Sequence, residues 1–238
     1  VYTDRPYRKT YREFCDQCNE IARGLMGMGI KKGDTVALWA TNEPEWLLTM
    51  WATAKIGPIM VTVNTNSKIF ELEYLLRQSD SCTLIMVGEV KGNSYLDTVN
   101  QLCPNLAKLE PGTVSNETLP YLKNIIFVGE RAKTPAGMYH WDDLYEFAKV
   151  VPEEARAQQQ AKLDIHDVIN MQYTSGTTGF PKGVMLTHNN VVNNGKSIGD
   201  CMTFTPDDRL CIPVPFFHFF GLVLALMASV TLVSHTHL

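Results

Sequence analysis

Apolar residues recur along the chain with two different periods, which predict alternating helices and strands. Steps of three and four residues separate Phe14, Cys18, Ile21, Leu25 and Met28, as on one face of an amphipathic helix. Short apolar runs between polar or glycine-containing turns predict strands instead. The expected helices span residues 14–28, 46–56, 71–79 and 141–150, and residues 153–162 are either a polar helix or a connector. The expected strands span residues 35–39, 59–63, 83–87, 124–128, 168–173, 184–186 and 210–214.

Helices and strands that alternate in this way favour βαβ units and a mainly parallel sheet, so the predicted fold class is α/β. Asn42 and Pro44 predict the start of the second helix, and Thr187 predicts the cap of a further helix from Val191 onward. Residues 100–120 are expected to form a surface excursion. The polar stretch 153–162 is expected to connect two possible lobes, residues 1–150 and 164–238.

The stretch from Tyr173 to Val184 reads Tyr-Thr-Ser-Gly-Thr-Thr-Gly-Phe-Pro-Lys-Gly-Val and joins two of the predicted strands. Its glycines allow backbone N–H groups to converge on one point, its hydroxyl groups add neutral donors, and Lys182 adds a positive charge. This combination suits a polyphosphate.

Two other interpretations of this stretch fit less well. A flexible linker has the same small residues, but Pro181 stiffens the chain directly before Lys182. The P-loop of nucleoside triphosphatases requires a different spacing. Here Gly176 and Gly179 stand too close together, and Gly183 occupies the position of the metal-binding serine or threonine.

Composition limits the partners of the chain. It has 238 residues, 45% of them hydrophobic, and a net charge of −4 from interspersed acids and bases. A sizeable core is therefore possible, and no basic face for nucleic acid or anionic membrane is expected. Six cysteines without a regular framework favour a reduced, cytoplasmic protein, and the Cys15-x-x-Cys18 pair lacks the further ligands of a zinc site. No signal-peptide pattern follows Val1.

The Tyr173–Val184 stretch resembles the phosphate-binding loop of the AMP-forming acyl-CoA synthetase, adenylation-domain and luciferase superfamily, whose pattern [YF]-T-S-G-[ST]-T-G-x-P-K-G-V it matches at every position. Similar matches occur from Arg8 to Phe14, from Lys31 to Ala37, from Asn42 to Trp46 and from Val63 to Leu76. The resemblance implies the large-domain fold of these adenylate-forming enzymes, with stacked βαβ subdomains.

The resemblance also implies roles for individual residues. The loop would hold the β- and γ-phosphates of ATP, and Lys182 would offset the charge of the departing pyrophosphate. A threonine, with Thr174 as the candidate, would lie near Mg²⁺. The candidate nucleotide-binding residues are Thr174, Ser175, Gly176, Thr177, Thr178, Gly179, Lys182 and Gly183.

A histidine lies among four phenylalanines in Pro215-Phe-Phe-His-Phe-Phe-Gly221. On its own, His218 is more often a hydrogen-bonded histidine of an aromatic core. The corresponding P-x-x-H-x-x-G element of the resembled family lines the acyl pocket and orients the adenylate. By this resemblance His218 is a catalytic candidate together with Lys182, and His218, Phe219 and Gly221 are candidates for the substrate pocket. His188 is weighed as a ligand or base against an ordinary polar residue of a helix cap.

The last part of the chain departs from the family. Residues 216–233 lack charged side chains, and we interpret them as a buried strand end and core helix in preference to a membrane span. The tail from Thr231 to Leu238 shows no match, and His235 and His237 lack a third metal ligand. The Y-G-x-T-E and T-G-D elements and the lysine of the small carboxy-terminal domain are absent from this sequence. We therefore expect an incomplete large domain that does not turn over alone.

The predicted activity of the intact protein is the ATP-dependent conversion of a carboxylic acid to an acyl-adenylate and then, with coenzyme A, to an acyl-CoA. A fatty or aryl acid fits better than an amino acid, and the resemblance favours a medium- or long-chain fatty acid. Alternatives within the superfamily are a peptide-synthetase adenylation domain and a luciferase-like monooxygenase. A non-catalytic nucleotide-binding module is the alternative from another class. The sequence leaves the chain length of the acid and the oligomeric state open.

Overall fold

The computed structural model describes residues 1–2, 6–174, 180–232 and 235–237, and its centre is a seven-stranded sheet in the order β7-β6-β3-β1-β2-β8-β9. Every neighbouring pair is parallel except β8 and β9, which form an antiparallel ribbon. The predicted α/β class with a mainly parallel sheet is confirmed. The strands are β1 (Thr35–Trp39), β2 (Ile59–Thr62), β3 (Thr83–Val87), β6 (Asn124–Val128), β7 (Tyr139–His140), β8 (Val168–Thr174) and β9 (Lys182–Thr187).

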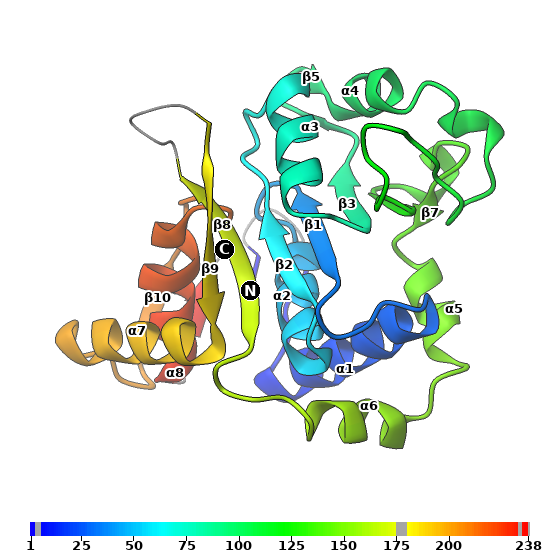
Figure 1. Cartoon of the computed structure of the whole chain (residues 1–238). Coiled ribbons are helices and arrows are strands. Elements are labelled where there is room, and N and C mark those ends of the chain that lie inside the picture. The colour runs from blue at the N-terminus through cyan, green and yellow to red at the C-terminus, as the bar shows by residue number, and fades with distance from the viewer. Residues whose placement is uncertain (3–5, 175–179, 233–234, 238) are drawn as a thin grey trace.

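Helices cover this sheet because its strands are joined by crossover connections. The helices are α1 (Tyr11–Gly27), α2 (Pro44–Ile56), α3 (Ile69–Gln78), α4 (Tyr95–Leu102), α5 (Asp143–Ala148), α6 (Glu153–Gln160), α7 (His188–Cys201) and α8 (Ala228–Thr231). The step from β1 to β2 runs in one direction across the sheet and the step from β2 to β3 runs back past β1. Right-handed crossovers therefore place α2 and α3 on opposite faces, and α3 lies in front of the sheet in Figure 1.

The core strands agree closely with the sequence pattern, because β1, β3 and β6 have the predicted bounds. All five residues of β1 and all five of β3 are buried, as expected for central strands of a sheet covered on both faces. The predicted helices are also present, with ends that differ by a few residues. The sheet contains β2 and β8 as neighbours, so strands from both predicted lobes share it. The division into lobes stays a prediction.

Helix α4 was not predicted from the sequence, and its end overlaps the start of the predicted surface excursion at residues 100–120. Helix α4 begins after Ser94, whose side chain accepts a hydrogen bond from the Asp97 N–H. Its first residue, Tyr95, stacks on Trp39 with ring centroids 3.5 Å apart. The serine cap three residues before an acidic residue is a signal that could have identified this helix. Short elements β4 (Glu89–Val90), β5 (Asn93–Ser94) and the 3₁₀ turns η1 (Leu106–Lys108) and η2 (Arg131–Lys133) complete this region.

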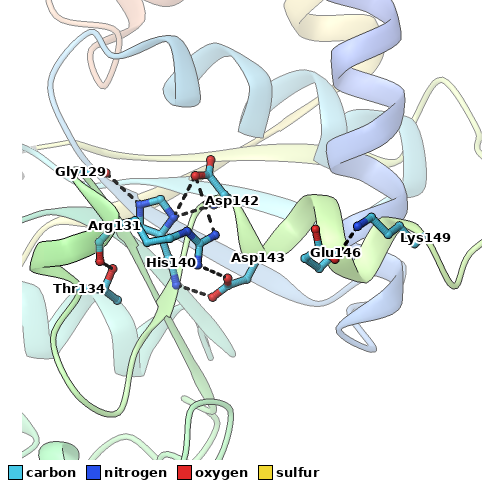
Figure 2. Close-up of polar contacts among 8 residues, drawn as sticks. All are labelled: Gly129, Arg131, Thr134, His140, Asp142, Asp143, Glu146 and Lys149. Carbon is cyan, nitrogen blue, oxygen red and sulfur yellow. Dashed lines mark hydrogen bonds and ion pairs between the residues drawn. The ribbon is translucent and has the colours of Figure 1, made fainter.

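Helix α5 begins two residues later than expected because the preceding backbone is held by His140 and Asp143 (Figure 2). The buried His140 ring accepts a hydrogen bond from the Asp142 N–H at Nδ1, 3.0 Å away, so its proton lies on Nε2, which donates to the Gly129 carbonyl at 2.9 Å. The Asp143 carboxylate accepts from the His140 N–H and from Arg131, each at 2.8 Å. These bonds fix an extended backbone up to residue 140, and the helix starts beyond it.

The last segments pack against the far side of the β8–β9 ribbon, at the left of Figure 1. Helix α7 contacts α8 and the π-helix η3 (Phe220–Met227). The predicted strand 210–214 is shorter, β10 (Arg209–Cys211), and it pairs in parallel with β11 (His235–His237). Within the described part of the chain, no helix is both long and apolar enough to cross a membrane.

Candidate functional site

The two stems of the glycine-rich loop are fixed by strand pairing. In the antiparallel ribbon Tyr173 pairs with Gly183 and Thr174 pairs with Lys182. Directly opposed residues of an antiparallel pair present their side chains on the same face, and the next pair presents its side chains on the other face. Thr174 and Lys182 therefore share one face of the ribbon, and Tyr173 and Gly183 share the other. Both Thr174 and Lys182 are exposed.

Lys182 is thus the first residue of β9, earlier than the strand start predicted at Val184. In the part of the chain that the structure describes, the Lys182 ammonium takes part in no ion pair. Its charge is consequently free to interact with an anionic ligand. Ser175, Gly176, Thr177, Thr178 and Gly179 lie outside the described residues.

The opposite face of the ribbon rests on α3. The Tyr74 ring stacks on Phe180, with centroids 5.0 Å apart, and the Tyr74 hydroxyl donates to the Pro181 carbonyl at 3.2 Å. The Tyr173 hydroxyl bonds to the side-chain oxygen of Gln78. Tyr74 and Gln78 have no distinguishing signal in the sequence, because nothing in the local pattern of α3 shows that the loop stems about 100 residues later contact it.

His218 lies in a different segment, which is attached to the beginning of α2. The Asn42 side chain donates to the Val214 carbonyl and accepts from the Phe216 N–H, both at 2.9 Å. Phe216 is fully buried and packs on Trp46, with centroids 5.3 Å apart. Asn42 therefore does not cap α2, contrary to the prediction. The cap position is Glu43, which makes no capping bond with its side chain, because the Asn42 amide is used by the distant segment.

The candidates for the substrate pocket have different surroundings. The side chain of His218 is exposed, and its Nδ1 accepts from the Phe220 N–H at 3.1 Å. Phe219 is half-buried. A side chain at Gly221 would approach the Pro215 carbonyl oxygen to 2.3 Å, so glycine is required there by backbone packing. Two cavities of about 850 and 410 Å³ are formed by other residues, and the pocket role of these three residues stays a prediction.

His188 lies at the end of the ribbon opposite to Lys182. Thr187 caps α7 as predicted by accepting from the Asn190 N–H, and His188 is the first residue of that helix. Val168, at the start of β8, pairs with Thr187. Burial lowers the pKa of His188, and its Nε2 is buried without a hydrogen-bond partner. This position separates His188 from the loop by the length of β9, roughly 20 Å for six residues.

These features define an α/β protein whose sheet ends in a ribbon with an exposed lysine at the base of a glycine-rich loop. The model of the AMP-binding enzyme family matches residues 1–237. The chain therefore belongs to the family of AMP-binding enzymes, which includes the AMP-forming acyl-CoA ligases. The match includes most of the tail, so the expectation that residues after Val230 fall outside the family is wrong.

Curated relatives and solved structures agree with this assignment. The protein named "Putative acyl-CoA synthetase YngI" of Bacillus subtilis is 54% identical over 97% of this chain. The mitochondrial medium-chain acyl-CoA ligase ACSF2 of Danio rerio is 36% identical over 94% of it. The chain spans 42% and 37% of the length of these two relatives.

Among solved structures, the anthranilate CoA ligase AuaEII in complex with anthranoyl-AMP superposes over the whole of this chain with a TM-score of 0.82 at 24% identity, and the chain covers 41% of that structure. ATP-bound MatB from Rhodopseudomonas palustris superposes with a TM-score of 0.73 at 22% identity, again over the whole chain and 41% of that structure. At these identities the likeness establishes the fold.

Proposed function

We propose that the full-length protein activates a carboxylic acid with ATP and transfers the acyl group to coenzyme A. The observation that carries this proposal is the ribbon geometry: Thr174 and Lys182 lie on one exposed face at the base of a loop that matches a polyphosphate-binding pattern. Membership of the AMP-binding family supports the use of a nucleotide. The printed name of the relative at 54% identity supports coenzyme A as the acceptor.

In the first step, a carboxylate oxygen attacks the α-phosphorus, the bond between the α-phosphorus and the bridging oxygen breaks, and pyrophosphate leaves. In the second step, a thiolate attacks the acyl carbon and AMP leaves. Such displacements depend mainly on positioning and on neutralisation of developing charge. We assign the neutralisation of developing charge on the departing pyrophosphate to the Lys182 ammonium. We assign contacts with the phosphates to Thr174 and the loop that follows it.

A magnesium ion fits this site as a companion of ATP. No group of three or more histidine, cysteine or acidic residues suited to a metal exists among the residues that the structure describes. Mg²⁺ commonly keeps several waters and binds through substrate phosphates with few protein ligands. The exposed Thr174 hydroxyl suits such a limited role, and the ion would supply charge neutralisation for the phosphates.

We propose a medium- or long-chain fatty acid as the substrate. The segment around His218 is rich in phenylalanine and carries no carboxylate to pair with the ammonium of an amino acid. The ACSF2 relatives are named as medium-chain ligases. We also propose a cytoplasmic location, because all six cysteines are free thiols.

The decisive test is acid-dependent ATP–pyrophosphate exchange by the full-length protein, with fatty acids of several lengths, an aryl acid and amino acids compared. Lys182→Ala should lower the exchange rate by about 10²-fold or more, as expected for loss of a charge that stabilises the transition state. Lys162→Ala, at another exposed lysine, is the control. An unchanged rate in Lys182→Ala would remove this residue from the mechanism, and ATP binding without any exchange would favour a non-catalytic nucleotide-binding module.

A further inference from the structure

Helix α3 presents two polar side chains to the ribbon from one face. Tyr74 and Gln78 are separated by four residues, so they lie one above the other on the helix surface. Leu72, Leu75 and Leu76 form its buried side. Tyr74 is half-buried and Gln78 is exposed. The helix is thus anchored in the core by leucines while a separate stripe remains available for contacts with the loop stems.

Tyr74 holds the stem that follows the loop. Its ring is nearly parallel to that of Phe180, with an interplanar angle of 21°, and its hydroxyl reaches the carbonyl of Pro181. Proline already restricts the backbone at this position. The direction in which the chain enters β9 at Lys182 is therefore set by one ring contact, one hydrogen bond and one fixed dihedral angle.

Gln78 holds the stem that precedes the loop. Its side-chain oxygen accepts a hydrogen bond from the Tyr173 hydroxyl. Burial raises the pKa of Tyr173 to about 12, so this hydroxyl stays protonated and can donate at neutral pH. The same oxygen of Gln78 would lie 3.3 Å from a Cβ at Gly183, the strand partner of Tyr173, so Gln78 lies against both strands of the ribbon.

We propose that Tyr74 and Gln78 are positioning residues that clamp both stems of the loop to α3, so that Thr174 and Lys182 are held on the opposite face toward the β- and γ-phosphates of ATP. This inference rests on the proposed function. The clamp acts on the stem residues Tyr173, Phe180 and Pro181, and it lowers the conformational freedom that Thr174 and Lys182 would otherwise lose on binding phosphates.

The discriminating measurement is the affinity for ATP compared with that for AMP, obtained by calorimetry on the full-length protein. ATP carries the β- and γ-phosphates that the loop is proposed to bind, and AMP lacks them. A change that only loosens the fold would weaken both nucleotides to a similar extent. A change in the clamp should weaken ATP selectively.

Tyr74→Phe removes only the hydroxyl and leaves the ring on Phe180. We expect it to weaken ATP about fivefold relative to AMP, which equals about 1 kcal/mol at 1.4 kcal/mol per factor of ten. Tyr74→Ala removes the ring contact as well and should have a larger effect. Gln78→Ala should resemble Tyr74→Phe. Tyr121→Phe, at a tyrosine with 57% exposure outside the site, is the matched control and should change neither affinity.

The outcomes separate this inference from the proposed function. If the wild-type protein binds ATP and both Tyr74→Phe and Gln78→Ala keep its ratio of ATP to AMP affinity, the clamp is refuted and the function stands. An equal loss for both nucleotides in these variants also refutes it, because the residues would then be merely structural. If the wild-type protein binds no ATP, the proposed function fails and the inference fails with it.

Discussion

The two side-chain hydrogen bonds of Asn42 should contribute more to the free energy of unfolding than those of an ordinary surface asparagine, because they join two segments that are 172 residues apart. Asn42→Ala removes the donor to the Val214 carbonyl and the acceptor of the Phe216 N–H. Each lost hydrogen bond contributes about 1 kcal/mol, and a buried group left without a partner costs about 1–3 kcal/mol. Since Phe216 is fully buried, we expect a total destabilisation of about 2–4 kcal/mol.

Thermal melting of the full-length protein checks this expectation. For a domain of about 150–250 residues a change of 1 kcal/mol moves the melting temperature by about 2–4 °C, and the full-length protein is larger, so at about 2 °C per kcal/mol or less Asn42→Ala should lower it by at most about 4–8 °C. Asn42→Asp keeps an acceptor for the Phe216 N–H but places a carboxylate oxygen where the amide donated to the Val214 carbonyl, so it should also be less stable than the wild type. Asn100→Ala, at an exposed position of α4, should stay within about 0.5 kcal/mol of the wild type.

If Asn42→Ala melted no lower than Asn100→Ala, the two hydrogen bonds of Asn42 would not contribute the stability assigned to them. Because the segment held by Asn42 carries His218, Asn42→Ala is also expected to raise the KM for the acid more than the KM for ATP under the proposed function.

Two further predictions concern buried titratable groups. Burial raises the pKa of Cys18 to about 12, so in the native protein iodoacetamide should label the exposed Cys15 and leave Cys18 unlabelled. Peptide mass spectrometry measures the labelling of each cysteine, and both should react equally in denaturant, which is the control. Equal labelling in the native protein would place Cys18 at the surface. Burial also lowers the pKa of His188 below the ordinary value of 6.5. Below pH 6.5 the unfolded chain therefore binds more protons than the folded chain, and stability that is fully present above pH 6.5 should be lost as the pH falls from that value through the lower pKa of the folded state. His188→Gln should reduce this loss in acid melting curves relative to His218→Gln, made at an exposed histidine; identical pH dependence in the two variants would contradict the assignment.

Local patterns predicted the elements whose signals are themselves local. The central strands are short apolar runs, and β1, β3 and β6 have the bounds that these runs indicate. Thr187 caps α7 through a bond to a residue three positions later. Helix α4 carried a comparable signal at Ser94 and was missed because its apolar residues occupy only two turns. Such elements require no knowledge of distant contacts.

Site residues with distant partners could not be found in this way. The glycine-rich motif indicates a loop and its ligand class, but it contains no information on which helix supports the stems. Tyr74 and Gln78 have ordinary helical positions in the sequence, and only the fold brings them to Pro181 and Tyr173. For Asn42 the local pattern was present but indicated the wrong role. Its sequence context is typical of a helix cap, and a partner 172 residues away occupies its amide instead.

These contacts bear on the possible division into lobes at residues 150 and 164. Asn42, Tyr74 and Gln78 belong to the first lobe, and each of them holds a segment of the second. The sheet continues across the same boundary, because Met60 pairs with Asn170 and the Asn170 side chain also donates to the Met60 carbonyl at 3.1 Å. A chain separated between the lobes would expose the edges of β2 and β8, which favour association with other strands. Residues 1–150 and 164–238 therefore depend on each other for the geometry of the loop stems.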